Sequence, residues 1–265
     1  MHHRFRFQPL QTLPLPGTAF YREHLVPADL AAAVYCFWEL DWPPGAEQAY
    51  PVLPDGCTDL VFSLLPGEPG WVSVTGRQSL WIPFSGRQHF VGARFFPGFF
   101  PSWFRHSLSG MEGQSVLLSD VPGLDAEAWE ARFQGRTPSE AMLQLAEFLR
   151  FIGASMSRSP DPRLMHALHA LMQTGGDPTR VAQLDIGLSE RQLRRHMESA
   201  TGLSPKVFAR IVRFQEAFRF KHLHPGLPFH AWPDFGYYDQ AHFCHEWNQL
   251  TAGLPEHWRS LPDTD

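Results

Sequence analysis

One short segment of the chain, residues 188–202, has the sequence LSERQLRRHMESATG and carries the signals of a capped helix. Ser189 is a preferred capping residue, and Gln192 follows three positions later, where the second member of a capping box belongs. Between Ser189 and Gly202 there is room for about three helical turns. The segment therefore predicts a helix that begins after Ser189 and ends near Gly202.

The two faces of this expected helix differ in chemistry. Apolar side chains recur at i, i+4 and i+7, namely Leu193, Met197 and Ala200. Another face carries arginines and one glutamate, namely Arg191, Arg194, Arg195 and Glu198. One face can be buried while the other presents guanidinium groups along a rod that fits the DNA major groove. A solvated basic face without a partner is the alternative, and the surrounding sequence has to decide between the two.

Charge is distributed unevenly along the chain, whose formal net charge is −5. Residues 189–221 contain eight Lys and Arg against three Glu, which gives +5. Residues 225–265 contain one Arg against six acidic residues, which gives −5. A basic island is the footprint expected of phosphate contact, whereas the acidic end argues against uniform nucleic-acid binding by this whole region.

The composition indicates a globular protein. Of its residues, 43% are hydrophobic and 18% are charged. The length of 265 residues is enough for one large domain or for two smaller ones. No apolar run approaches the length of a membrane span, and the start of the sequence lacks a signal-peptide core. The three cysteines are scattered, which fits a reducing compartment. We therefore expect a cytoplasmic protein with no membrane partner.

Residues 1–153 predict a β-rich domain with two trailing helices. Short runs rich in Val, Phe and Trp are separated by Pro and Gly, at 34–40, 58–65, 71–76, 79–84 and 89–96. The helices are expected at 125–133 and 138–152, the second with Thr137 as its cap and Glu140 as capping-box partner. The apolar stripe of the second helix must pack on its own sheet or on a second subunit, which leaves a homodimer open.

The rest of the chain predicts an all-helical domain, residues 161–262, after a small and polar linker, residues 154–160. The expected helices are 162–173, 177–187, 189–202, 205–222 and 239–250. One pattern occurs twice, first as GLS followed by TGLSP in residues 187–205, then as GYYD followed by TAGLP in residues 236–255. A duplicated helix–turn–helix joined by a long helix is more specific than either unit alone. The predicted fold class is α+β.

At these residues the chain resembles the AraC family of transcription regulators. The resemblance lies in GLSERQLRRHMESATGLSPKVFARIVRFQEA, residues 187–217, and FGYYDQAHFCHEWNQLTAGLPEHW, residues 235–258. Weaker similarity to the N-terminal domains of one AraC subgroup lies in PDGCTDLVF, residues 54–62, and GARFFPG, residues 92–98. The resemblance implies a cupin-like domain that senses an effector or dimerises, and double-stranded DNA as the partner. The metal-binding pattern of cupins is absent, so we expect no metal and no cofactor.

The resemblance also implies which residues contact DNA. The first unit would supply Ser189, Arg191, Gln192, Arg194, Arg195 and Glu198, supported by Lys206 and Arg210. The second would supply Gln240, Ala241, His245 and Asn248. Basic residues are common in the family where His245 and Asn248 stand, and no Lys or Arg lies between Pro225 and Trp258. We therefore expect the first unit to provide most of the affinity. Pro233 is a further departure from the family pattern. It lies in the short first helix expected for the second unit, AWPDFG, and proline shortens or kinks a helix.

The front domain offers candidates for binding a small effector, namely Trp38, Asp55 and Arg94. Arg94 suits an anionic ligand group, and it could equally be a structural ion-pair partner. No nucleophile elbow, phosphate loop or dinucleotide fingerprint occurs, so we expect no enzyme and no catalytic residues. The alternative to a sequence-specific regulator is a ligand-binding or protein-interaction module whose helix–turn–helix fold has degenerated.

Overall fold

The computed structural model describes residues 8–11, 15, 18–44, 49–84, 86–155, 158–177, 179, 186–252 and 260. The fold is α+β, with a β-rich N-terminal part and a helical C-terminal part, as the sequence predicts. Six strands form an antiparallel sheet in the order β1-β2-β7-β4-β5-β8. Their bounds are β1 (Phe20–His24), β2 (Val34–Trp42), β4 (Thr58–Ser63), β5 (Trp71–Val74), β7 (Gln88–Phe95) and β8 (Ser115–Leu117). A smaller antiparallel pair consists of β3 (Ala49–Val52) and β6 (Leu80–Pro83).

Successive side chains along the large sheet alternate between two apolar cores, because neighbouring residues of a strand point to opposite faces. Phe37 and Phe62 belong to the core beneath the helices that follow the sheet. Their neighbours Trp38 and Val61 belong to a second core together with Tyr50 of β3. Both faces of the large sheet are therefore covered, which explains why β2 and β7 are almost wholly buried.

Short helices and one long helix cover the first of these faces. They are α1 (Phe100–Phe104), the 3₁₀ turn η1 (Leu118–Asp120), α2 (Ala126–Glu130) and α3 (Pro138–Ser155). The predicted capping box of α3 is confirmed, with the Thr137 amide donating to Glu140 at 2.9 Å. The apolar stripe of α3 is fully buried in its own domain, as its residues Leu145, Phe148, Leu149 and Ile152 show. The predicted linker, residues 154–160, begins inside α3.

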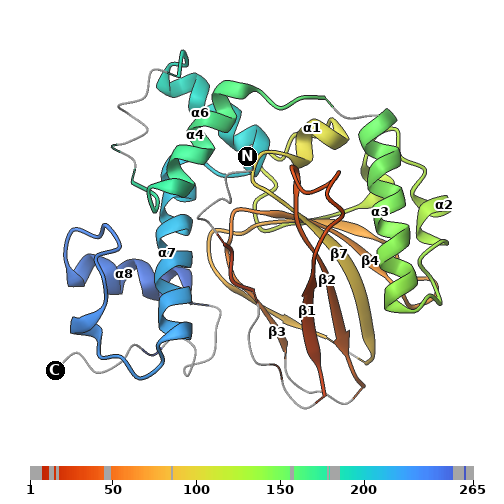
Figure 1. The fold of residues 1–265 in the computed structure, drawn as a ribbon, viewed down its shortest axis with the longest axis horizontal. Helices are drawn as coiled ribbons and strands as arrows, with labels where there is room; N and C mark the ends of the chain where they lie inside the picture. The colour runs from red at the N-terminus through yellow and green to blue at the C-terminus, as the bar shows by residue number, and fades with distance from the viewer. Residues whose placement is uncertain are drawn as a thin grey trace.

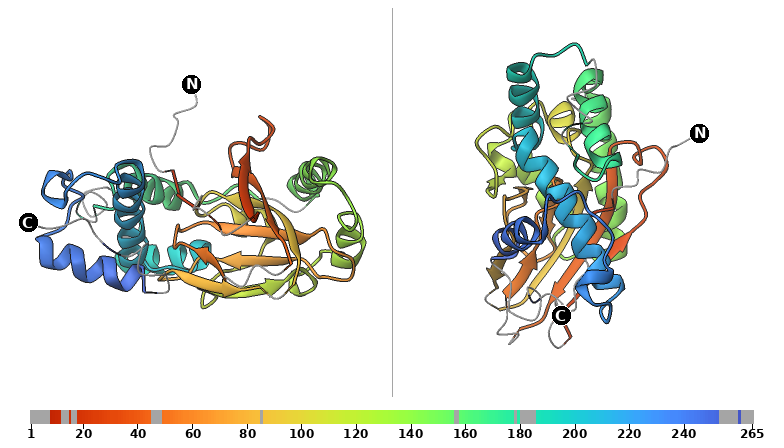
Figure 2. Two further views of the ribbon diagram at one scale, coloured as in Figure 1. Left: turned by 90° about the horizontal axis from the view of Figure 1, so that it is seen from below. Right: turned by 90° about the vertical axis from the view of Figure 1, so that its left-hand side faces the viewer.

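The helical C-terminal part consists of α4 (Pro162–Gln173), α6 (Glu190–Thr201), α7 (Pro205–Leu223), the 3₁₀ turn η2 (Phe229–Ala231) and α8 (Gln240–Leu250). The predicted helix 177–187 lies largely outside the described residues. The first helix of the second predicted unit is only the turn η2, which ends before Pro233. Figures 1 and 2 show α7 standing between the large sheet and α8, with α2 and α3 on the far side of the sheet.

The β-rich part and the helical part contact each other through apolar side chains and through backbone hydrogen bonds. Leu53, which follows β3, belongs to the core of the helical part. A side chain at Gly56 would lie 2.7 Å from the ring of Phe208 in α7, and its φ of +75° also favours glycine. The amide of Leu108 donates to the carbonyl of Ser199 in α6 at 2.9 Å. The helical part is therefore docked on the loops at one end of the sheet.

Candidate functional site

The helix predicted from residues 188–202 is present as α6, with the expected cap at each end. The Ser189 amide donates to the side-chain oxygen of Gln192 at 2.9 Å, and the Gln192 amide donates to the Ser189 hydroxyl at 3.3 Å. Gly202 ends the helix in the left-handed conformation. Leu193 and Met197 are buried in the helical core. The caps and the apolar stripe together fix which face of α6 points outward.

The outward face of α6 carries the predicted basic side chains. Arg191, Gln192, Arg194 and Arg195 are all exposed. The Nε of Arg194 donates to Glu198 at 2.8 Å, yet 69% of the Arg194 side chain remains exposed. Among the described residues, no acidic side chain forms an ion pair with Arg191 or Arg195. A ligand approaching this face meets guanidinium groups whose N–H donors remain accessible.

The outward face of α8 is polar rather than basic. Asp239 caps this helix as predicted, accepting from the His242 amide at 2.7 Å. The predicted contact residues of the second unit are all exposed, namely Gln240, Ala241, His245 and Asn248. Their amide and imidazole groups can donate and accept hydrogen bonds but supply no permanent positive charge. The contrast with α6 is therefore one of charge and not of accessibility.

Part of the basic island holds α7 against α8. Arg210 Nε donates to Glu246 at 2.6 Å, and its Nη2 donates to Gln249 at 2.6 Å. Arg213, which is buried, donates to the carbonyl of Gly176 at 3.1 Å and to Glu246 at 3.4 Å. Glu246 is itself buried, so it needs these charges as partners. Of the predicted DNA-contacting residues on α7, Lys206 is exposed and Arg210 is half-buried.

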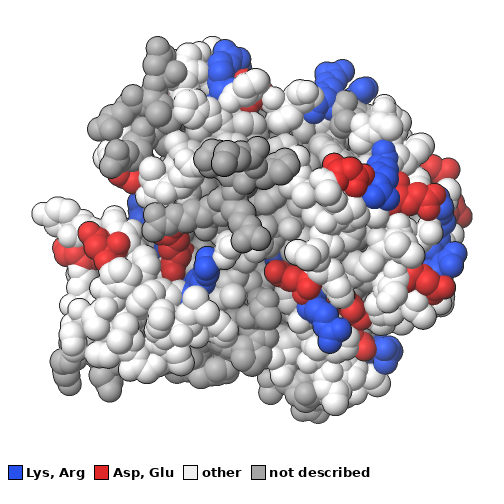
Figure 3. Space-filling model, viewed as in Figure 1, with Lys and Arg blue, Asp and Glu red and all other residues white. Residues whose placement is uncertain are grey.

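Figure 3 shows the charged side chains on one face of the molecule. On this face, the Lys and Arg residues that are described stand apart from one another, and several lie beside acidic residues. On this face, the described residues therefore form no broad basic surface.

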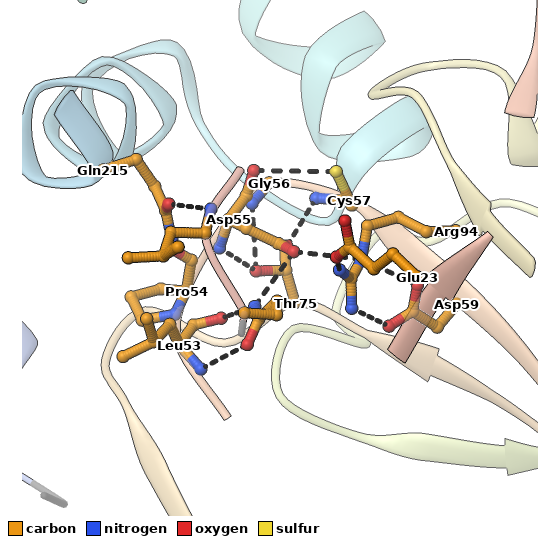
Figure 4. A network of polar contacts seen from close by, with 12 residues as sticks. Glu23, Leu53, Pro54, Asp55, Gly56, Cys57, Asp59, Thr75, Arg94 and Gln215 are labelled. Carbon is orange, nitrogen blue, oxygen red and sulfur yellow. Dashed lines mark hydrogen bonds and ion pairs between the residues drawn. The ribbon is translucent and has the colours of Figure 1, made fainter. Parts of the chain in front are cut away.

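A buried polar network surrounds Arg94 of β7 in the β-rich part of the chain (Figure 4). The Arg94 side chain is only 4% exposed. Its Nε and Nη2 donate to the two carboxylate oxygens of Asp59 at 3.0 and 2.9 Å. Its Nη1 donates to the hydroxyl of Tyr21 at 3.1 Å and to Glu23 at 3.3 Å. The ion-pair role is thus what the structure shows for Arg94, and its role toward an anionic ligand stays a prediction.

Asp55 joins this network from the turn before β4. One of its oxygens lies 3.3 Å from Arg94 Nε and accepts from the Gln11 side chain at 3.0 Å. Its other oxygen accepts from the Cys57 amide at 2.9 Å. The hydroxyl of Thr75 accepts from the amides of Asp55 and Gly56, each at 3.2 Å. The turn Pro54-Asp55-Gly56-Cys57 is therefore held by side chains from distant parts of the chain.

The network contains more acidic than basic groups. Three carboxylates, those of Glu23, Asp55 and Asp59, contact the single guanidinium of Arg94. Burial raises the pKa of Asp59 above the usual range of an aspartate, and the charge of Arg94 opposes this rise. Such a cluster favours the uptake of a proton, a cation or a hydrogen-bond donor.

A cavity of about 140 Å³ opens next to these carboxylates. Asp55, Asp59 and Thr75 line it, whereas Arg94 and Trp38 are not among its lining residues. A cavity of similar size, about 150 Å³, can hold a molecule as large as benzene. Of the predicted ligand-binding residues, the structure thus places only Asp55 at the cavity wall.

The network extends directly to the helical part of the chain through Gln215 of α7, whose side chain is buried. Its oxygen accepts from the Leu10 amide at 2.7 Å, and its nitrogen donates to the carbonyl of Pro54 at 2.8 Å. Gln11 bonds the backbone of Leu53 in both directions, at 2.6 and 3.1 Å. Sequence reasoning missed Gln11 and Gln215, because no local pattern marks a polar residue whose hydrogen-bond partners lie between 42 and 205 residues away.

Comparison with known protein families gives a match over part of the chain. Residues 22–117, from within β1 to the end of β8, match the family described as a domain of unknown function, DUF6597. This domain typically forms the N-terminal part of AraC-type regulators. The match ends before the helical part of the chain. Neither the curated proteins nor the solved structures yield a significant match.

Within the described residues, none of the helices has the length and apolar character needed to cross a membrane.

Proposed function

We propose that the protein is a sequence-specific DNA-binding transcription regulator whose β-rich domain senses a small ligand. One observation carries the proposal: α6 is a capped helix with a buried apolar stripe and three exposed arginines, Arg191, Arg194 and Arg195. The sequence around it resembles the first helix–turn–helix unit of the AraC family. The match of residues 22–117 to a domain typical of the N-terminal part of such regulators supports the same function.

In this function α6 enters the major groove and reads bases through its arginines. A planar guanidinium can donate two hydrogen bonds to one guanine, and each such pair discriminates against the wrong base. Lys206, exposed at the start of α7, adds a phosphate contact. The second unit adds polar contacts from Gln240, His245 and Asn248. Most of the affinity, and most of its dependence on salt, comes from the first unit.

The cavity beside Asp55 and Asp59 is the proposed sensing site. Its wall presents carboxylate and hydroxyl oxygens, so the ligand that it favours is small and carries N–H or O–H donors or a positive charge. A ligand that displaces the turn at Pro54 also strains the hydrogen bond from Gln215, which lies on the helix between the two units. This bond gives ligand binding a physical route to the DNA-binding helices.

Selection of bound duplexes from a random DNA pool, followed by anisotropy titration, tests the proposal. Replacing Arg194 by Ala relaxes the preference at one base and weakens binding to the selected site about ten- to a hundredfold. Arg136→Ala, which removes an exposed arginine on the β-rich side, is the matched control and leaves the affinity unchanged. Failure of the wild-type protein to enrich any sequence, with or without a library of small cationic ligands, would contradict the proposal.

A protein-interaction or ligand-binding module is the second candidate. It is favoured by the second unit, in which η2 replaces a full helix and Glu246 pairs with Arg210 and Arg213. This candidate predicts weak binding that depends on salt but not on sequence. Equal affinity for the selected duplex and a scrambled duplex of the same length would support it. Sedimentation of the free and the DNA-bound protein tests whether the chain forms a homodimer, which its sequence leaves open.

A further inference from the structure

The turn between β5 and β6, residues 75–79, separates two hollows. On one side, Thr75, Gly76 and Gln78 line the cavity next to Asp55. On the other side, Arg77 and Gln78 line an open groove of about 530 Å³. The remaining lining residues of this groove come from the helical part, namely Arg210, His245, Asn248, Gln249 and Ala252. A loop of the β-rich domain thus forms one wall of a groove whose other wall is the outward face of α8.

One backbone hydrogen bond holds this turn against the second unit. The amide of Ser79 donates to the carbonyl of Leu250, the last residue of α8, at 2.7 Å. Ser79 is completely buried, so this contact excludes water. Arg77 lies two residues earlier and forms an ion pair with Glu112 at 2.7 Å. Its side chain is nevertheless 62% exposed, so most of its donors remain accessible from the groove.

The groove has the chemistry of a site for a phosphate. Its described lining residues include two arginines, one histidine and three carboxamides, and none of them is acidic. Arg210 already donates to Glu246 and Gln249, so its charge is partly neutralised. Arg77 is the more exposed of the two arginines. The second unit has no Lys or Arg of its own between residues 225 and 258. The cation that this unit lacks is thus brought to its outward face by the other domain.

We propose that Arg77 contacts a phosphate of duplex DNA beside the bases that α8 faces. The proposal rests on the proposed DNA-binding function and extends the interface to a residue of the β-rich domain. A guanidinium at this position positions the second unit on the DNA backbone without reading sequence. It also places part of the interface on the same turn that forms the wall of the proposed ligand cavity.

The test compares the salt dependence of DNA binding for the wild type, R77Q, R77K and R87Q, using the duplex selected by the wild type. Arg87 is the matched control, because it is also an exposed arginine of the β-rich domain paired with an acid, Asp41. R77Q lowers the slope of log K against log salt by about 0.9, the value for one phosphate contact. R77K and R87Q keep the wild-type slope. Thermal melting of the free variants checks that each is folded.

A second arm locates the contact. Duplexes are prepared with single uncharged methylphosphonates along each strand. One such position in the half of the site bound by the second unit weakens wild-type binding and leaves R77Q unaffected. A wild-type slope in R77Q, or an affected phosphate in the half bound by α6, overturns the role of Arg77 alone. Absence of any sequence preference in the wild type overturns the proposed function first, and this inference with it.

Discussion

The Arg94 network makes a demanding prediction about stability. Replacing Arg94 by Met removes the four hydrogen bonds that the guanidinium donates and leaves the buried Asp55 and the partly buried Asp59 without their shared counter-charge. Removing one partner of a buried ion pair costs about 3–5 kcal/mol, because the remaining charge loses its counter-charge and cannot regain water. We expect a loss of this size in the free energy of unfolding at pH 7.5. In R94M/D59N, a neutral amide replaces the closest carboxylate, and at least half of the loss should be recovered.

The stability lost in R94M should also depend on pH. Burial raises the pKa of Asp59, and R94M removes the positive charge that opposes this rise. A carboxyl whose pKa is higher in the folded state than in the unfolded state favours folding at low pH, and this contribution is lost as the pH rises through the folded-state value. The deficit of R94M relative to the wild type should therefore be smaller at pH 5 than at pH 7.5. D59N should remove most of this pH dependence.

Urea unfolding followed by tryptophan fluorescence measures these differences. Arg87→Met is the control, since it removes an exposed arginine paired with Asp41, and its effect should stay within about 0.5 kcal/mol. A loss below about 1 kcal/mol in R94M would refute the reasoning. So would a loss of equal size at both pH values, because it would show that Arg94 contributes packing and not charge neutralisation.

Two further predictions concern the helical part. Gln215→Ala leaves the Pro54 carbonyl and the Leu10 amide without their buried partner, and the free energy of unfolding in urea should fall by about 2–4 kcal/mol; the exposed control Gln114→Ala should change it by less than about 0.5 kcal/mol. Burial lowers the pKa of His169 in the folded state. When the pH falls below the usual histidine pKa, the unfolded chain therefore binds a proton that the folded chain does not, and the stability should fall as the pH drops from 7 to 5. His169→Gln should flatten that part of the stability profile, and an unchanged slope would exclude His169 as its cause.

Local signals predicted where several of the helices begin. Ser189 with Gln192, Thr137 with Glu140, and Asp239 each cap a helix through bonds to residues three positions away. Such bonds depend only on sequence neighbours, so the sequence suffices to place them. The apolar runs of β2 and β7 were likewise visible, because strands buried on both faces are almost continuously hydrophobic.

Long-range contacts could not be predicted in the same way. Strand β3 contains Pro51 and only four residues, and it exists because β6 pairs with it. Asp59 and Arg94 were visible as charged residues in apolar strands, yet their pairing depends on the register of β4 and β7. The position of Arg77 beside α8 follows from how the domains dock. The sequence contained these residues but not their proximity.

The placement of Leu53 in the core of the helical part has a consequence for how the molecule can be divided. A fragment that begins at α4 would leave Phe208 without the turn of the β-rich part that packs against its ring, although its helices would all be present. The helical part is therefore not an independent domain, although its repeated helix–turn–helix pattern suggests one. If the N-terminal domain were exchanged between related chains, the turn at residues 53–57 and the residues of α7 that contact it would have to be exchanged together.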